Sequence, residues 1–184
     1  HNWYSKTGWD NLWNVIEKLD VDHIMYTPKR SLVNRLARKS LPAIGDSCWH
    51  CHSGIGSFGI EAISRDAKKV IFVENYIGVL PILKKNLSKL QFLDNYLIIE
   101  KNILINFDFK IFKEKFDLIF IDPPYKENDL TKLLISILEN KVLKRGGIII
   151  IHRHKDQKDI FPETFKIIEE KKYGKSKITF GSYY

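Results

Sequence analysis

The sequence lacks the features that mark membrane-spanning and exported proteins. It contains no run of about 18 or more apolar residues, which a membrane-spanning helix needs, and no signal peptide opens it. We therefore expect a cytoplasmic location. Internal repeats and low-complexity linkers are absent too, and 184 residues are too few for two domains of usual size. The sequence predicts one domain over residues 1–184, with an atypical N-terminal segment at 1–45 and the core at 46–184.

Acidic residues are fewer than basic ones. The chain has 22 Asp and Glu against 30 Lys and Arg, which gives a net charge of +8. A basic surplus favours a polyanionic partner, because each phosphate that is neutralised releases counterions. Any single cluster of basic residues can equally be an ordinary solvated face, so the net charge is only supporting evidence for a polyanionic partner. The clusters are Lys29, Arg30, Arg35, Arg38 and Lys39; Lys84, Lys85 and Lys89; and Lys171, Lys172, Lys175 and Lys177.

From about residue 47 onward, strand-like and helix-like segments alternate. Strand-like runs lie at 47–52, 69–74, 96–101, 116–121 and 147–152, and helix-like segments at 57–65, 76–90 and 128–139. Two later segments, 165–171 and 175–180, are typical of an antiparallel strand pair around Tyr173-Gly174. This order predicts an α/β fold with a doubly wound, mostly parallel sheet and an antiparallel C-terminal edge.

Residues 1–45 differ from the rest in composition. Trp3, Trp9 and Trp13 are crowded there, and Pro28 and Pro42 interrupt the segment. We predict two helices, near residues 9–19 and 29–41, which pack on the sheet or cover the site.

The four residues Asp122-Pro123-Pro124-Tyr125 directly follow the apolar run at 116–121. Open α/β sheets bind their ligands at the carboxyl ends of their strands. Pro-Pro fixes two φ angles and removes two backbone donors, so the carbonyls of this loop are expected to be free to accept hydrogen bonds. An acid, a carbonyl and an aromatic ring suit the planar amino group of a nucleobase, which offers two N–H donors and a π-face. The alternative is an ordinary strand-end turn with a coincidental acid.

A glycine motif, G-x-G-x-x-G, spans residues 54–59 and precedes a helix-like segment. The glycines allow a tight turn and a close approach of a ligand, and the helix points its positive N-terminus at the site. Glu74 ends the next strand-like run, about 20 residues past the loop, where a ribose-binding carboxylate belongs. The alternative for Glu74 is a solvated charge at a strand end.

Three stretches together resemble the bacterial 16S ribosomal RNA guanine-N2 methyltransferase family. They are residues 54–67 (GIGSFGIEAISRDA), 72–74 (FVE) and 116–125 (FDLIFIDPPY), and the closing segment 173–178 (YGKSKI) is also similar. The resemblance covers roughly residues 54–184. It implies a Rossmann-like fold, S-adenosylmethionine as the methyl donor, and methylation of the exocyclic amine of one guanine in the small-subunit RNA.

The resemblance also implies a role for particular residues. Glu74 would hold the ribose hydroxyls, and Asn102, where the family usually has an acid, would lie near the adenine. The implied cofactor-binding set is Gly54, Gly56, Ser57, Glu74, Asn75, Asn102 and Ile103, and the implied catalytic set is Asp122, Pro123, Pro124 and Tyr125. The implied partner is 16S rRNA or a small-subunit assembly particle. We expect a monomer that needs neither a metal nor a membrane.

Besides Asn102, three places depart from the family pattern. Before the glycines the family has an apolar strand ending in Asp-Leu-Phe-Ala, whereas this chain has His50-Cys51-His52-Ser53. An imidazole cannot replace a carboxylate that faces the cofactor's ammonium group, so weakened cofactor binding is expected. His152 stands where an acid usually follows the fifth strand. The family's basic N-terminal arm is not recognisable in residues 1–30.

The segment Cys48-Trp49-His50-Cys51-His52 fits other patterns as well. It matches C-x-x-C-H, which attaches haem, and C-x-x-C, a redox pair, and it gathers four possible ligands of a soft metal. Haem attachment needs an exported protein, and the sequence shows no export signal. A redox pair normally begins a helix directly after a strand, whereas here a glycine loop intervenes. Alternate residues of a strand face opposite sides, which argues against a zinc site. We expect ordinary strand residues here and keep metal, redox and haem as alternatives.

The predicted chemistry is direct methyl transfer to the guanine amine. Hydrogen bonds from this amine to Asp122 and to a proline carbonyl would free its lone pair, and Tyr125 would stack on the purine. The guanine must be unstacked, so a single-stranded or looped RNA site is expected.

Three alternatives to this function remain. An adenine-N6 or cytosine-N4 methyltransferase would be expected to carry a large target-recognition insertion. A nicotinamide-dependent oxidoreductase has no role for Asp-Pro-Pro-Tyr, and a non-catalytic RNA-binding relic would have lost its cofactor loop.

Overall fold

The computed structural model describes residues 47–51, 53–64, 67–89, 95–105, 107–124 and 129–183. Within them, seven strands form one sheet in the order β3-β2-β1-β4-β5-β7-β6. The strands are β1 (Ser47–Cys51), β2 (Lys69–Val73), β3 (Tyr96–Ile99), β4 (Phe116–Ile121), β5 (Leu143–His154), β6 (Lys166–Tyr173) and β7 (Ser176–Ser182). The helices predicted at 9–19 and 29–41 lie outside the described residues.

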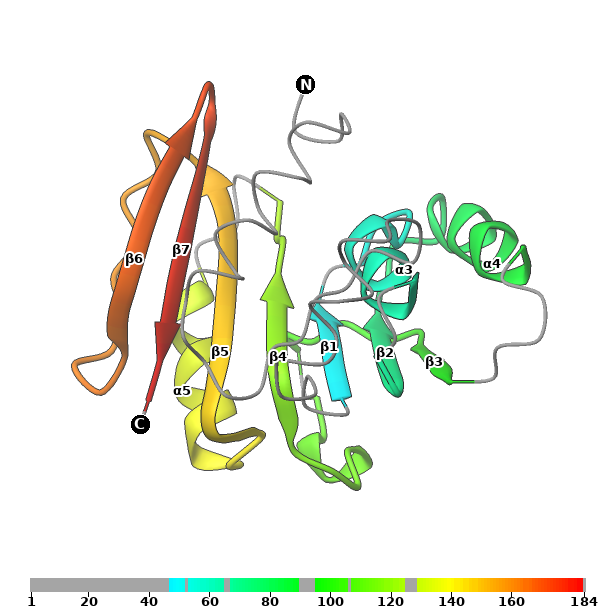
Figure 1. The fold of residues 1–184 in the computed structure, drawn as a ribbon, viewed down its shortest axis with the longest axis horizontal. Coiled ribbons are helices and arrows are strands. Elements are labelled where there is room, and N and C mark those ends of the chain that lie inside the picture. Colours follow the sequence, from blue (N-terminus) through cyan, green and yellow to red (C-terminus); the bar gives the residue numbers. More distant parts are fainter. Residues whose placement is uncertain are drawn as a thin grey trace, which may run out of the picture.

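The sheet is parallel except for its last two strands. β1 to β5 run parallel to one another, and β7 is antiparallel to both β5 and β6. Figure 1 shows the β6–β7 hairpin at one edge and β3 at the other. The predicted doubly wound sheet with an antiparallel C-terminal edge is therefore confirmed. The strand order reverses between β1 and β4, and in open α/β sheets such a switch point is where ligands bind.

The described helices are α3 (Ser57–Ser64), α4 (Leu80–Ser88) and α5 (Leu130–Glu139), with a 3-10 turn η2 at Phe109–Ile111. The prediction began the second helix at residue 76, but α4 begins at Leu80. The reason is a turn before it, in which the Val79 N–H donates to the Tyr76 carbonyl at 3.0 Å, and a proline lies in the first helical turn. None of these helices is long and apolar enough to cross a membrane.

Side chains of the central strands alternate between two cores, one on each face of the sheet. Phe72 and Phe120 belong to a cluster that includes α3 and α4, whereas Ile71 and Ile119 belong to a cluster that includes α5. This alternation follows from the two-residue period of a strand. Phe58 of α3 stacks on Phe120 with ring centroids 4.0 Å apart and an angle of 6° between the planes. The start of α3, and with it the preceding loop, is thus fixed against the middle of the sheet.

One acid lies inside the apolar strand β4. Asp117 is 2% exposed, and its carboxylate accepts a hydrogen bond from Lys144 Nζ of β5 at 2.8 Å. β5 begins at Leu143, earlier than the predicted residue 147, and its pairing register with β4 shifts between Phe116 and Leu118. The lysine on the neighbouring strand explains how a carboxylate is tolerated there, since buried charges need a partner.

Candidate active site

The carboxyl ends of β1, β2, β3 and β4 lie at one edge of the sheet, because these strands are parallel and adjacent (Figure 1). The candidate side chains follow those ends. Gly54 and Gly56 come after β1, Glu74 after β2, Asn102 after β3 and Asp122 after β4. The fold therefore brings residues that are far apart in the sequence to one edge, at the switch point of the sheet.

The loop between β1 and α3 is a tight turn. The Gly56 N–H donates to the Ser53 carbonyl at 2.8 Å, and the Ile60 N–H donates to the Gly56 carbonyl at 2.9 Å, which begins α3. Gly54 and Gly56 have φ angles of 51° and 88°. Both values lie in the left-handed region that favours glycine. The turn directs the positive N-terminal end of α3 at the edge of the sheet.

Glu74 fastens this glycine loop to the end of β2. Its Oε2 accepts from the Gly54 N–H at 2.7 Å, and its Oε1 accepts from the N–H groups of Asn75 and Tyr76 at 2.8 and 2.9 Å. Glu74 is only 6% exposed. The alternative that Glu74 is a solvated strand-end charge is therefore wrong. A carboxylate has about four acceptor positions, so three N–H groups leave room for about one more donor.

The remaining residues of the implied cofactor set lie around the same edge. Ser57 is half-buried at the start of α3, and Asn75 is exposed beside Glu74. Asn102 accepts a hydrogen bond from the Leu104 N–H through Oδ1 at 2.9 Å, which shapes the turn after β3. Ile103 is 4% exposed and belongs to the core that includes α5. Ile103 thus anchors this turn in the core.

The loop after β4 starts beside the end of β1. The Asp122 N–H donates to the Cys51 carbonyl at 3.3 Å. The Asp122 side chain is 18% exposed, Pro123 is buried and Pro124 is exposed. The loop is therefore mostly covered at Asp122 and Pro123 and open to solvent at Pro124. Tyr125, predicted to stack on the base, lies outside the described residues.

The sequence did not connect His152 with Asp122, but the fold brings the two side chains into contact, and Ser176 contacts His152 from its other side. His152 Nδ1 lies 2.8 Å from Asp122 Oδ1, and His152 Nε2 lies 2.9 Å from Ser176 Oγ. The parallel register explains the first contact, since Ile121 pairs with Ile151 and the next residue of each strand then lies side by side. If the sequence had indicated the pairing register between β4 and β5, it would also have indicated the contact between Asp122 and His152.

A buried ionic cluster lies beneath the same loop. Arg153 is 1% exposed; its Nε donates to Asp159 Oδ1 at 3.0 Å and its Nη1 donates to the Pro124 carbonyl at 3.0 Å. Lys177 Nζ lies 3.8 Å from Asp159 Oδ2 and donates to the Gln157 carbonyl at 2.8 Å. The prediction that the loop carbonyls are free is therefore wrong for Pro124. A guanidinium from β5 holds that carbonyl and limits the movement of the loop.

Little of the histidine–cysteine segment before the glycines can be described. His50 contributes its backbone to β1, paired with Phe72 and Phe120, but its side chain and His52 lie outside the described residues. Cys51 is fully buried in the core that includes α5. Cys51 is thus an ordinary core residue. The expectation of weakened cofactor binding at His50 stays a prediction.

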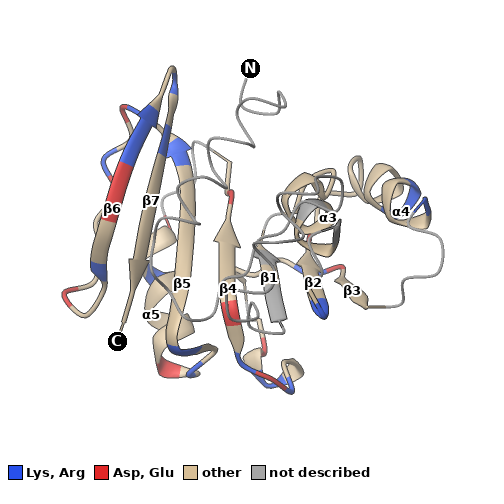
Figure 2. Ribbon diagram, viewed as in Figure 1, with Lys and Arg blue, Asp and Glu red and all other residues tan. Residues whose placement is uncertain are grey.

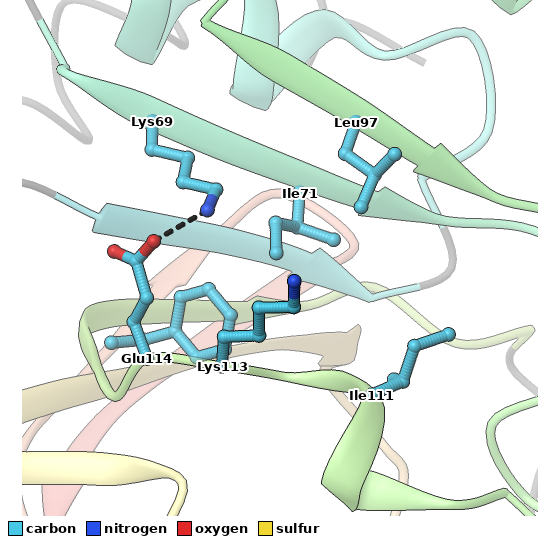
Figure 3. A pocket seen from close by; sticks show the side chains of 7 residues that line it. Lys69, Ile71, Leu97, Ile111, Lys113 and Glu114 are labelled. Atoms are coloured by element: carbon cyan, nitrogen blue, oxygen red, sulfur yellow. Dashed lines mark hydrogen bonds and ion pairs between the residues drawn. The ribbon is translucent and has the colours of Figure 1, made fainter.

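Figure 3 shows a pocket of about 200 Å³ that is separate from this site. It is lined by Lys69, Ile71, Leu97, Ile111, Lys113, Glu114 and Phe116. Lys69 and Phe116 are the first residues of β2 and β4, so the pocket lies at the amino ends of the strands. The candidate active site occupies the opposite edge of the sheet.

Two features of the glycine loop fit the cofactor that the resemblance implies. No atom lies within 4 Å of the place where a Cβ on Gly54 would stand, so a ligand can approach the backbone there. Beside it lies the carboxylate of Glu74, a buried acid with remaining acceptor capacity. S-adenosylmethionine carries two ribose hydroxyls, and one of them can donate to the acceptor position that remains on Glu74, next to the open stretch of backbone at Gly54. The residues present therefore fit this cofactor.

Comparison with known proteins points to one family. The family model described as Conserved hypothetical protein 95 matches residues 27–182. Ribosomal RNA small subunit methyltransferase D of Haemophilus influenzae is 34% identical over 148 residues, which make up 79% of this chain and 75% of that protein. The protein of the same name from Buchnera aphidicola (of Acyrthosiphon pisum) is 38% identical over 125 residues, 67% of this chain and 64% of the relative. The chain thus spans just under two thirds of the second relative.

The solved structures agree with this assignment. A Haemophilus influenzae protein assigned as a methylase superposes with a TM-score of 0.62 at 31% identity, covering 74% of this chain and 85% of that one. Its similarity confirms the Rossmann-like methyltransferase fold and, at the level of the family, S-adenosylmethionine as the cofactor. The chain therefore belongs to the family described as Conserved hypothetical protein 95, the family of the ribosomal RNA small subunit methyltransferase D proteins.

Proposed function

We propose that this chain transfers a methyl group from S-adenosylmethionine to the exocyclic N2 of a guanine in 16S ribosomal RNA. The observation that carries the proposal is the placement of Asp122. Its carboxylate lies at the switch point of the sheet, and its backbone is bonded to the end of β1, the strand that leads into the glycine loop. The relatives' names support methylation of ribosomal RNA. The guanine amine is our own step beyond them.

The bound cofactor would supply an electrophilic methyl group on a positively charged sulfur. The protein then has to present a nitrogen to that methyl group. The N2 lone pair of guanine is delocalised into the ring, which makes N2 a poor nucleophile. A hydrogen bond from N2–H to the Asp122 carboxylate draws the nitrogen toward sp³ geometry and frees this lone pair. The nitrogen loses one proton as it gains the methyl group, and the Asp122 carboxylate is the acceptor beside it. Most of the rate should come from alignment of the two reactants.

The loop after β4 is held so that Asp122 keeps its place. The Arg153 guanidinium holds the Pro124 carbonyl at 3.0 Å, and His152 holds the Asp122 carboxylate at 2.8 Å. With Pro124 occupied, Pro123 supplies the carbonyl that we propose as the second acceptor for the amine. Tyr125 would stack on the purine, an interaction worth about 1–3 kcal/mol per base.

Basic residues extend the site toward an RNA backbone. The β6–β7 hairpin turn lies at the same end of the sheet as Asp122, because Ser176 pairs with His154 at the carboxyl end of β5. Figure 2 shows blue segments at the tip of this hairpin and at the end of β5. The exposed lysines of this end include Lys155 and Lys158 after β5 and Lys172 and Lys175 at the hairpin. We propose that they bind phosphates flanking the target guanine.

Neutralising two of these lysines should weaken RNA binding in a salt-dependent way. Each phosphate contact that is lost reduces the slope of log affinity against log salt by about 0.7–0.9, so Lys172→Ala combined with Lys175→Ala should reduce it by about 1.5. The measurement is filter binding of 16S rRNA fragments over a range of salt concentrations. The matched control is Lys110→Ala with Lys113→Ala, because Lys113 and Ile111, the neighbour of Lys110, line the pocket at the opposite end of the sheet. Equal slopes for the two double variants would show that the hairpin does not contact RNA.

Replacing Glu74 by alanine should weaken S-adenosylmethionine binding by about 1.5–3 kcal/mol, the worth of hydrogen bonds to a charged group. The change removes an acceptor for the ribose and also releases the Gly54 N–H. Titration calorimetry measures the affinity, and thermal unfolding shows whether the variant stays folded. Glu114→Ala, which removes an exposed ion-paired carboxylate at the other end of the sheet, is the control. An unchanged affinity in Glu74→Ala would leave Glu74 with a structural role only.

Two other functions remain as alternatives. A methyltransferase acting on adenine N6 or cytosine N4 could use the same acid, since each base offers an exocyclic amine. A catalytically impaired RNA-binding relic would keep the basic hairpin but bind no cofactor. Saturable binding of S-adenosylmethionine in calorimetry would argue against the relic.

The proposed function is tested by methyl transfer to separated nucleic acids. Purified protein is incubated with isotope-labelled S-adenosylmethionine and, in parallel, with 16S rRNA, small-subunit particles, 23S rRNA or DNA. We expect label in 16S rRNA, free or in particles, and background label in the other two. Label in DNA or in 23S rRNA alone would overturn the proposal.

A further inference from the structure

Three polar side chains form a line from the interior of the sheet to the candidate active site. They come from the adjacent strands β7, β5 and β4: Ser176 Oγ lies 2.9 Å from His152 Nε2, and His152 Nδ1 lies 2.8 Å from Asp122 Oδ1. Ser176 is 7% and His152 is 3% exposed, whereas the Asp122 side chain is 18% exposed. Asp122 is therefore the member that a substrate reaches.

This burial order separates the line from the catalytic triads of hydrolases. In those triads the serine is the nucleophile that meets the substrate and the acid is buried behind the histidine. Here the order relative to the surface is reversed. Ser176 lies behind the histidine in the sheet, so Ser176 cannot act as a nucleophile from this position.

We propose that His152, held by Ser176, is a positioning residue that fixes the orientation of the Asp122 carboxylate toward the target amine. The inference rests on the proposed function and adds a residue to its machinery. An ionised Asp122 only accepts hydrogen bonds, so His152 Nδ1 carries the proton that lies between them. The Ser176 hydroxyl is hydrogen-bonded to Nε2 and keeps the imidazole ring of His152 from rotating. A ring held at both nitrogens fixes Oδ1 and thereby the direction in which the other oxygen of Asp122 accepts.

Two amide variants of His152 separate positioning from general support of the fold. In His152→Asn the amide nitrogen stands near the place of Nδ1, so donation to Asp122 is kept and the Ser176 contact is lost. In His152→Gln the amide reaches the place of Nε2, so the Ser176 contact is kept and Asp122 loses its donor. We expect His152→Asn to retain kcat within about threefold and His152→Gln to lose about tenfold or more, with KM for S-adenosylmethionine unchanged in both. Equal kcat losses in the two variants, or losses that follow their melting temperatures, would overturn the proposal.

A second measurement does not depend on activity. Nitrogen-15 chemical shifts of the His152 ring report which nitrogen is protonated. We expect a protonated Nδ1 in the wild-type chain, and a shift change at Nδ1 in Asp122→Ala. An unprotonated Nδ1 overturns the positioning proposal whatever the substrate is. A wild-type chain that methylates another amine, with Nδ1 protonated and His152→Gln impaired, would contradict the guanine assignment and still support the role of His152.

Discussion

Replacing Asp122 by alanine is expected to abolish methyl transfer while leaving S-adenosylmethionine binding nearly intact. The carboxylate is the acceptor that prepares the amine and takes its proton, and general-base groups contribute about 10²–10⁴-fold to a rate. The structure adds a cost that the sequence did not indicate. Without the carboxylate, the buried His152 loses a partner at 2.8 Å, which costs about 1–3 kcal/mol of stability.

Asp122→Asn separates these two effects. The asparagine keeps an oxygen that can accept from His152 but has no negative charge, so we expect a stability close to wild type and a rate below about one tenth of it. That loss corresponds to about 1.4 kcal/mol or more of transition-state energy. Asp156→Ala, which removes an exposed acid at the same end of the sheet, is the control and should keep its activity. More than a tenth of the wild-type rate in both Asp122 variants would contradict the catalytic role.

Replacing Arg153 by methionine is expected to destabilise the fold by about 3 kcal/mol. Breaking a buried ion pair by removing one partner typically costs about 3–5 kcal/mol, because the other charge stays buried. Asp159 is that charge, with its side chain 4% exposed. Lys177 Nζ lies 3.8 Å from Asp159 Oδ2 and neutralises part of the Asp159 charge, so we expect a loss at the lower end of this range. The Pro124 carbonyl loses a donor as well, so methyl transfer should fall together with stability.

Urea unfolding of the two proteins measures this difference in free energy. Arg145→Met is the matched control, because Arg145 lies on the same strand but is exposed. A surface substitution of that kind usually changes stability by no more than about 0.5 kcal/mol. A loss below about 1 kcal/mol in Arg153→Met, similar to the control, would show that the buried cluster contributes little to the fold.

Most of the sheet could be predicted from the sequence because its strands have simple patterns. The runs around Phe72 and Phe120 are apolar on both faces, as expected of parallel strands covered by helices on both sides. The boundaries were less accurate where side chains decide them. α4 starts four residues after the predicted position, since the turn at Tyr76 and Val79 delays it, and the Asp108 side chain caps a 3-10 turn that no periodicity indicated.

The candidate site was predicted in part, for a physical reason. Glu74 and Asp122 each follow a strand end, and the parallel order of the strands is enough to bring them to one edge. The contacts of His152 and Arg153 depend on the register between β4 and β5 and on a loop that reaches back with Asp159. Neither is encoded in a local pattern. His152 stood out only as a departure from the family, whereas the structure gives it a partner.

The most direct test of the proposed chemistry is the identity of the methylated nucleoside. 16S rRNA treated with the wild-type chain and S-adenosylmethionine is digested to nucleosides and analysed by mass spectrometry, with Asp122→Asn as the control. The proposed function predicts N2-methylguanosine as the new nucleoside, absent from the control digest. New N6-methyladenosine or N4-methylcytidine in place of N2-methylguanosine would contradict it.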